Sequence, residues 1–127
     1  MKKSLITSDK APKAIGPYSH AVQVGDFVYT SGQIPIDPAT GKVESSDIAD
    51  QTRLVLNNLA AVLSAADLVF EDVVKTTIFL TSMSDFAVVN EIYAGVFAEI
   101  LPARSTIEVA GLPLGVKIEI EAIACKK

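Results

Sequence analysis

Two stretches of this sequence repeat their apolar residues at the three- and four-residue spacing of an amphipathic helix. The first covers residues 47–66, where Asp47 is the predicted N-cap and Asp50 follows three residues later. The second is expected to begin with Ser84 as its N-cap and to end before Pro102. Each helix has one apolar face that needs a partner surface. In the second helix we expect this buried stripe to consist of Phe86, Val89, Tyr93, Val96, Phe97 and Ile100.

Segments rich in β-branched residues, or with alternating polarity, predict strands before, between and after these helices. The predicted strands are residues 21–24, 27–31, 73–81, 104–109 and 116–124. The first two form a hairpin around Gly25 and Asp26, and a loop with several Pro and Gly residues follows it. Because two amphipathic helices can cover only one face of such a sheet, we expect an α+β layer fold. The chain shows no repeat or linker, so we expect one domain over residues 1–127.

The last predicted strand separates apolar from charged side chains by its alternation. Val116, Ile118, Ile120 and Ala122 are expected to face the core. The opposite face carries Lys117, Glu119, Glu121 and Ile123, and solvation is the simplest explanation of its three charges.

Arg104 is the most informative charged residue of the sequence. It is one of two arginines and lies in an apolar, strand-like run, whereas Arg53 lies in the first helix, where a solvated charge is ordinary. Burying a guanidinium without a partner costs several kcal/mol or more. Its planar fork suits bidentate binding of a carboxylate. The sequence leaves the partner open: Glu119 or Glu121 of the same chain, or a ligand.

Composition disfavours several classes of function. With a formal charge of −4, the chain has no general basic field for a nucleic-acid backbone. Its single histidine, His20, and single cysteine, Cys125, cannot build a metal site of the zinc type, and we expect His20 to be an ordinary hydrogen-bonded or solvated residue. A lone cysteine also fits a reducing cytosol. The first residues lack a signal-peptide pattern, and the apolar runs are too short to cross a membrane.

Several fragments in order resemble the YjgF family, also called the reactive intermediate deaminase (RidA) family. They are residues 14–18 (AIGPY), 30–35 (TSGQIP), 85–90 (DFAVVN), 102–105 (PARS) and 118–122 (IEIEA). The resemblance runs over nearly the whole chain. It implies a chorismate-mutase-like α+β fold, assembled as a homotrimer with clefts between subunits.

The resemblance also implies an activity. Deaminases of this family hydrolyse 2-imino acids such as 2-iminobutanoate and 2-iminopropanoate, and their enamine tautomers, to 2-oxo acids and ammonia without a cofactor. Carried over to this chain, Arg104 binds the substrate carboxylate and Glu119 positions or activates the attacking water. The other implied cleft residues are Tyr18, Ser31, Gly32, Asn90 and Thr106.

Each implied site residue has a structural alternative. Arg104 and Glu119 could form an ion pair across neighbouring strands, and Tyr18 could cap the core with its ring. Asn90 could lie on a helix surface. Ser31 is expected to contribute backbone geometry rather than a nucleophile, because no base is placed beside it. Many bacterial deaminases have a cysteine where this chain has Thr106, so a thiol-dependent property is not expected here.

Two functions remain open from the sequence. One is an enzyme that removes reactive imino acids. The other is a regulatory or interaction trimer that senses a 2-oxo acid of branched-chain amino-acid synthesis without useful turnover. Glu119 favours hydrolysis, because pure carboxylate binding gains nothing from a second anion nearby. A third description used in the family, translation inhibitor or ribonuclease, is disfavoured by the acidic charge.

Overall fold

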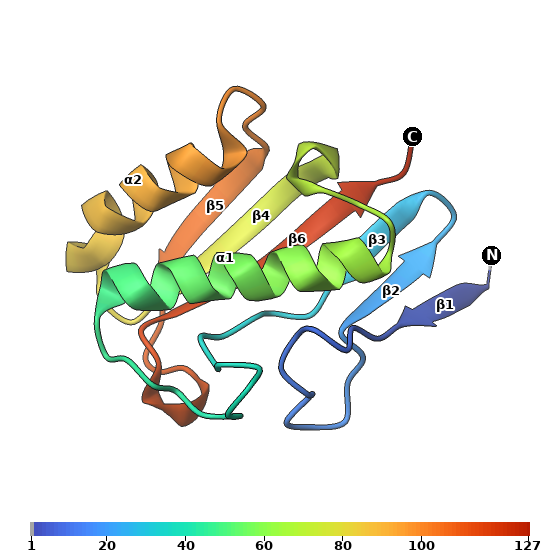
Figure 1. The fold of residues 1–127 in the computed structure, drawn as a ribbon. Helices are drawn as coiled ribbons and strands as arrows, with labels where there is room; N and C mark the ends of the chain where they lie inside the picture. Colours follow the sequence, from blue (N-terminus) through green and yellow to red (C-terminus); the bar gives the residue numbers. More distant parts are fainter. Residues whose placement is uncertain (1) are drawn as a thin grey trace.

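A six-stranded mixed sheet is covered on one face by two helices in the computed structural model of the chain, which describes residues 2–127 (Figure 1). The strands are β1 (Lys3–Ile6), β2 (Ala21–Val24), β3 (Phe27–Thr30), β4 (Val73–Leu80), β5 (Ala103–Glu108) and β6 (Ile118–Cys125). The helices are α1 (Ile48–Ala65) and α2 (Phe86–Phe97), with short 3-10 turns η1 (Phe70–Asp72), η2 (Met83–Asp85) and η3 (Pro113–Gly115). The expected α+β layer architecture is confirmed.

The order of the strands in the sheet is β1-β2-β3-β6-β4-β5. All neighbours are antiparallel except β4 and β5, which are parallel and are connected through α2. Such a connection needs a crossover, and an amphipathic helix provides it. The last strand of the chain, β6, therefore lies in the middle of the sheet. It separates the N-terminal hairpin from β4, and β4 in turn separates β6 from β5.

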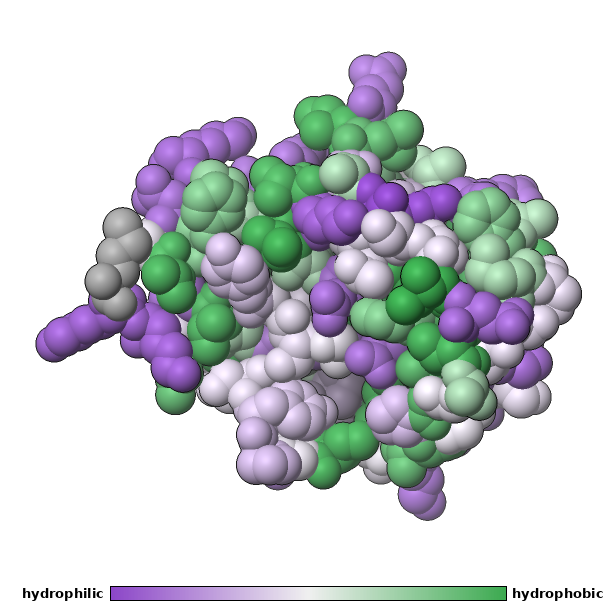
Figure 2. Space-filling view, turned by 180° about the vertical axis from the view of Figure 1, so that it is seen from behind, coloured by the Kyte–Doolittle hydropathy of each residue, from purple (hydrophilic) through white to green (hydrophobic). Residues whose placement is uncertain are grey.

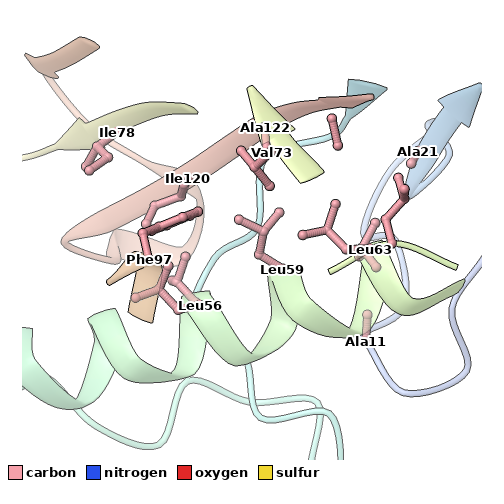
Figure 3. Packing of buried hydrophobic residues seen from close by; sticks show 14 of the residues in the cluster. Ala11, Ala21, Leu56, Leu59, Leu63, Val73, Ile78, Phe97, Ile120 and Ala122 are labelled. Atoms are coloured by element: carbon pink, nitrogen blue, oxygen red, sulfur yellow. The ribbon is translucent and has the colours of Figure 1, made fainter. Parts of the chain in front are cut away.

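The core lies between the sheet and α1 (Figure 3). Leu56, Leu59 and Leu63 project from one face of α1 toward the sheet, where Ile78 and Ile120 meet them. The alternation predicted for the last strand is confirmed, since Ile118, Ile120 and Ala122 are buried and Glu121 is exposed. Asp47 caps α1 as expected, because its Oδ2 accepts a hydrogen bond of 3.0 Å from the Asp50 N–H. Neither helix is long and apolar enough to cross a membrane within residues 2–127.

The start of α2 differs from the prediction. Ser84 is not its N-cap, because the chain first makes the 3-10 turn η2. The residue that caps this turn is Ser82, whose Oγ accepts a hydrogen bond from the Ser84 N–H. A serine two positions earlier was an equally good cap by residue type, so the sequence pattern did not separate them.

The end of α2 and the first strand also differ. The helix ends at Phe97, and Ala98 takes a positive φ of 50° that turns the chain away. Ile100 therefore lies outside the buried stripe and is 56% exposed. Strand β1 was not predicted, because Lys3–Ile6 is a four-residue edge strand with only Ile6 buried. Its short pattern gives no period to recognise.

Within residues 2–127, both helices lie on one face of the sheet and none covers the second face (Figure 1). Cross-strand partners place Leu5, Val22, Tyr29 and Ile123 in one row on this open face. Leu5 is 67% exposed and Tyr29 is 44% exposed. Figure 2 shows hydrophobic side chains here intermixed with hydrophilic ones. The open face thus combines apolar side chains with the charged residues of β6.

Candidate functional site

Arg104 and Glu119 lie on opposite faces of the sheet. Arg104 is the register partner of Thr76 on β4, which is itself opposite the buried Ala122, so these side chains share the helix-covered face. Glu119 is opposite Phe79 and points to the open face. The two residues are also separated by β4. The alternative of an Arg104–Glu119 ion pair across neighbouring strands is therefore wrong.

Glu119 lines a surface cavity of about 380 Å³ on the open face, which we call the Glu119 pocket. Its polar wall consists of Tyr18, Ser31, Gly32, Glu119 and Glu121. The sequence resemblance named four of these residues. It missed an apolar wall made by Ile15, Ile34 and Pro113. Ile15 and Ile34 lie in loops and Pro113 begins the short turn η3, so none of them belongs to a periodic pattern. None of the residues lining this pocket in the described chain is basic.

Gly32 touches the carboxylate of Glu119 directly. A Cβ atom at residue 32 would lie 2.6 Å from Cδ of Glu119 and closer still to Oε2. Any side chain at this position would force the carboxylate to move. The requirement for glycine here is therefore one of space, not of backbone conformation.

The pKa of the Glu119 carboxyl is raised above its ordinary value. Burial of the side chain is the main cause, and repulsion from the nearby Glu121 carboxylate adds to it. The sequence could not decide between this effect and the opposite effect of a neighbouring arginine. The position of Arg104 on the other face removes that opposing effect within one chain.

Ser31 and Tyr18 are held by hydrogen bonds at the rim of the same pocket. Ser31 Oγ donates to the Ser19 carbonyl at 2.6 Å, and the Ser31 N–H donates to the His20 carbonyl at 2.9 Å. Both bonds position Ser31 within the chain, and its expected place in the substrate cleft remains a prediction. Tyr18 is 44% exposed and its hydroxyl accepts from the Ile15 N–H, so its ring forms pocket wall rather than core.

Arg104 lines a second surface cavity, of about 320 Å³, which we call the Arg104 pocket. The other residues lining it are Asn90, Tyr93, Ala94, Leu101 and Pro102. The guanidinium lies 5.0 Å from the centre of the Tyr93 ring and 5.5 Å from that of Phe86. These are cation–π distances. Within the described residues Arg104 has no carboxylate partner, whereas Arg53 pairs with Asp50 at the surface of α1.

The two aromatic rings beside Arg104 were assigned by the sequence to the buried stripe of α2 only. Both rings also contact the Arg104 guanidinium. Tyr93 is part of the core as well, since it is buried and its hydroxyl is hydrogen-bonded to Thr76 Oγ1 at 2.6 Å. Burial raises the pKa of Tyr93, and the Thr76 hydrogen bond and the Arg104 charge partly oppose this. The phenol therefore stays neutral beneath the guanidinium.

Asn90 and Thr106 each bury a polar atom without a hydrogen-bond partner in the described chain, Oδ1 and Oγ1 respectively. Asn90 lines the Arg104 pocket, and Thr106 follows Arg104 by two residues on the same face of β5. Buried polar atoms are almost always hydrogen-bonded in native proteins. Both atoms lie on the Arg104 side and are not used by hydrogen bonds within the described chain.

The implied site residues thus form two groups in one chain. Tyr18, Ser31, Gly32 and Glu119 gather on the open face, and Arg104, Asn90 and Thr106 lie beyond β4 on the helix-covered face. No three His, Cys, Asp or Glu side chains gather as metal ligands between residues 2 and 127. The expectation of cofactor-independent chemistry remains a prediction.

Comparison with known proteins gives consistent matches over the whole chain. The sequence profile of the family described as endoribonuclease L-PSP matches residues 8–126. A RutC family protein of Pyrococcus horikoshii is 53% identical over 125 residues, covering 98% of this chain and 99% of that protein. The chloroplastic Reactive Intermediate Deaminase A of Arabidopsis thaliana is 48% identical over 124 residues, covering 98% of this chain and 66% of that protein. The crystal structure of Escherichia coli TdcF with bound serine has a TM-score of 0.93 at 46% identity, covering 98% of this chain and 99% of that one.

Removal of the Glu121 charge should lower the pKa of Glu119. We expect Glu121→Gln to do so because it removes a repelling carboxylate, and Glu91→Gln on α2 to have no such effect. Because the folded chain holds the Glu119 proton more tightly than the unfolded chain, its free energy of unfolding falls as the pH rises through the raised pKa. Glu121→Gln should weaken this fall. Carboxyl ¹³C NMR and urea unfolding across the acid range measure both effects, and an unchanged Glu119 titration would contradict the assignment.

Gly32→Ala should displace the Glu119 carboxylate without unfolding the chain. The added methyl group occupies the space of the carboxylate, which must move toward the open side of the pocket and regain solvent. The pKa of Glu119 should then fall toward its ordinary value. Gly111→Ala is the control, because nothing lies within 4 Å of a Cβ atom there. Equal Glu119 titrations in the two variants would refute the close contact.

Proposed function

The chain belongs to the YjgF/RidA family, and we propose that it hydrolyses small 2-imino acids to 2-oxo acids and ammonia. One observation carries this proposal: the two pockets have unbalanced charges of opposite sign. The Arg104 pocket contains a cation without a carboxylate, and the Glu119 pocket contains two carboxylates without a cation. A protonated imino acid carries a carboxylate at one end and an iminium nitrogen beside it. Its charges complement those of the two pockets.

Such a ligand can touch both pockets only if they come from two copies of the chain. Within one copy, Arg104 and Glu119 are on opposite faces of the sheet. The open face carries exposed apolar side chains such as Leu5 and Tyr29, which a second copy would cover. We therefore propose a homotrimer whose three clefts each combine the Arg104 pocket of one subunit with the Glu119 pocket of its neighbour. The serine bound to TdcF, a small amino acid with both charges, supports a ligand of this class.

The residues account for the reaction without a covalent intermediate. Arg104 binds the substrate carboxylate by its fork and orients the C=N carbon. Glu119 accepts a proton as water attacks this carbon, and the raised pKa of the carboxyl suits it to hold that proton. The proton then passes to the nitrogen of the tetrahedral adduct. The C–N bond breaks, ammonia leaves, and the C–OH group loses its proton to give the 2-oxo acid.

The pocket walls favour a short aliphatic substrate. Ile15, Ile34 and Pro113 provide an apolar surface beside Glu119, in a cavity of about 380 Å³. This surface suits the methyl or ethyl group of 2-iminopropanoate or 2-iminobutanoate better than a charged side chain. Cleavage of RNA, which the family description also mentions, is not supported by a chain with a formal charge of −4. A cytosolic location remains a prediction, since one relative is chloroplastic.

Arg104→Ala should reduce imine hydrolysis to the spontaneous rate, because the carboxylate loses its anchor. Arg104→Lys should restore little, since an ammonium offers a point charge instead of a fork. Arg53→Ala is the matched control at the other arginine, exposed on α1, and should leave the rate unchanged. The assay generates 2-iminobutanoate in situ with an amino-acid oxidase and follows its decay. Unaltered protein that binds 2-oxobutanoate but does not accelerate this decay would refute the enzyme and support the regulatory alternative.

Mixed trimers should recover activity from two inactive variants. Glu119→Gln is expected to lower turnover ~10²–10⁴-fold by loss of the base. When it is unfolded and refolded with an equal amount of Arg104→Ala, about a quarter of the clefts (one half times one half) should combine two intact pockets. Each variant refolded alone is the control. Light scattering should give about three times the 13.4 kDa chain mass. A monomer, or a mixture no more active than its components, would refute the shared cleft.

A further inference from the structure

We propose that His20 is a positioning residue that holds the segment 8–20, and with it Tyr18, as a wall of the Glu119 pocket, and that it can do so only while its imidazole is neutral. The inference rests on the proposed function, because this wall belongs to the same pocket. It adds a pH-dependent regulation to that pocket. His20 itself does not line the pocket.

The hydrogen bonds of His20 define one tautomer. The ring is buried, with 6% of the residue exposed. Nδ1 accepts from the Ser8 N–H at 2.9 Å, and Nε2 lies 2.8 Å from the Pro12 carbonyl oxygen. Because a backbone N–H can only donate and a carbonyl can only accept, Nδ1 has no proton and Nε2 carries one. Protonation of Nδ1 would place a donor against the Ser8 N–H and break this contact.

The same residue is joined to the Glu119 pocket through its backbone. The His20 carbonyl accepts from the Ser31 N–H, and the preceding carbonyl, of Ser19, accepts from Ser31 Oγ. Ser31 is a wall residue of the pocket and precedes Gly32. The ring of His20 thus bonds the start of the segment, at Ser8 and Pro12, to its end. The backbone of this end is in turn bonded to Ser31 in the pocket wall.

The middle of the segment is bonded mainly to itself, since the Tyr18 hydroxyl accepts from the Ile15 N–H and the Tyr18 N–H donates to the Gly16 carbonyl. Residues 13–18 are all exposed. Tyr18 lines both the Glu119 pocket and a second cavity of about 340 Å³, to which Ser8 and His20 also belong. Ile15 lines the Glu119 pocket and a third cavity, of about 380 Å³. The wall therefore has hollows on both sides, and the hydrogen bonds of His20 replace the packing that it lacks.

The charges around His20 do not provide another way to hold an imidazolium in place. The ionisable residues on the elements packed around it are Asp9, Lys10, Lys13 and Tyr18 of its own segment, Lys3 of β1 and Tyr29 of β3. Helix α1 meets the segment where Ser8 Oγ donates to the Ala61 carbonyl, and residues 57–65 contain no ionisable group. The nearest acid by sequence, Asp9, lines the second cavity. Lys13 lines the same cavity, so this cavity offers an imidazolium no net negative charge.

The test uses the fact that His20 is the only histidine, so that its ring signals in ¹H–¹⁵N NMR are unambiguous. We expect the Nε2–H tautomer at neutral pH, and a Ser8 amide shift that changes with the same midpoint as the His20 ring. The kcat/KM for 2-iminobutanoate should fall with that midpoint, by up to about 10²-fold if Tyr18 is displaced by an ångström. His20→Asn keeps an acceptor near the position of Nδ1. It should lose this step of the pH profile and stay more active than His20→Gln.

Ser8→Ala is the matched control, because it removes the bond to Ala61 but keeps the N–H that His20 accepts. It should leave the midpoint and the pH step unchanged. An Nδ1–H tautomer, a Ser8 amide that does not follow the His20 titration, or a pH step that persists in His20→Asn would overturn the proposal. The NMR measurements need no substrate. Coincident His20 and Ser8 titrations in a protein without imine hydrolysis would support the role of His20 while refuting the proposed function.

Discussion

The position of β6 in the middle of the sheet is the constraint on which the rest of the structure depends. Its alternation puts Ile118 and Ile120 into the core and Glu119 onto the open face, so the same strand builds both the fold and the acidic pocket. Because β4 pairs with β6 on one side and β5 on the other, Arg104 is kept away from Glu119. An ion pair that would neutralise both residues within one chain is thereby prevented.

This separation has an electrostatic consequence. Glu119 is desolvated beside Glu121 without a compensating cation, which raises the pKa of its carboxyl. Arg104 is held instead over the faces of Phe86 and Tyr93, and an aromatic face attracts a guanidinium without occupying its hydrogen-bond donors. The Arg104 guanidinium and the Glu119 carboxylate are thus held in place without forming an ion pair within the described chain. Both remain available to a third molecule that carries the complementary charges.

Local patterns in the sequence predicted the helices and strands better than they predicted which strands lie side by side in the sheet. The period of α1, its Asp47 cap and the two faces of β6 follow from local spacing, and the structure confirms them. The order of the strands does not follow, because pairing between residues distant in sequence leaves no local period. This is why an Arg104–Glu119 ion pair remained open until the register was known. The cap prediction failed for a different reason, since two serines of equal propensity compete at Ser82 and Ser84. The turn at Ala98 gives no local signal, because alanine rarely adopts a positive φ.

The candidate site depends even more on contacts between residues that are distant in the sequence. Its polar residues were recognised as a family pattern, but their division between two faces is a property of the sheet that no motif encodes. The apolar wall of Ile15, Ile34 and Pro113 lies in loops and in the short turn η3, where tertiary contacts alone decide what a side chain faces. His20 is the clearest case: its sequence context suggests an ordinary residue, and only the positions of Ser8 and Pro12 give its two nitrogens fixed and opposite roles. A buried group with both roles fixed cannot change its charge without changing its partners, and here those partners belong to the segment that forms the pocket wall.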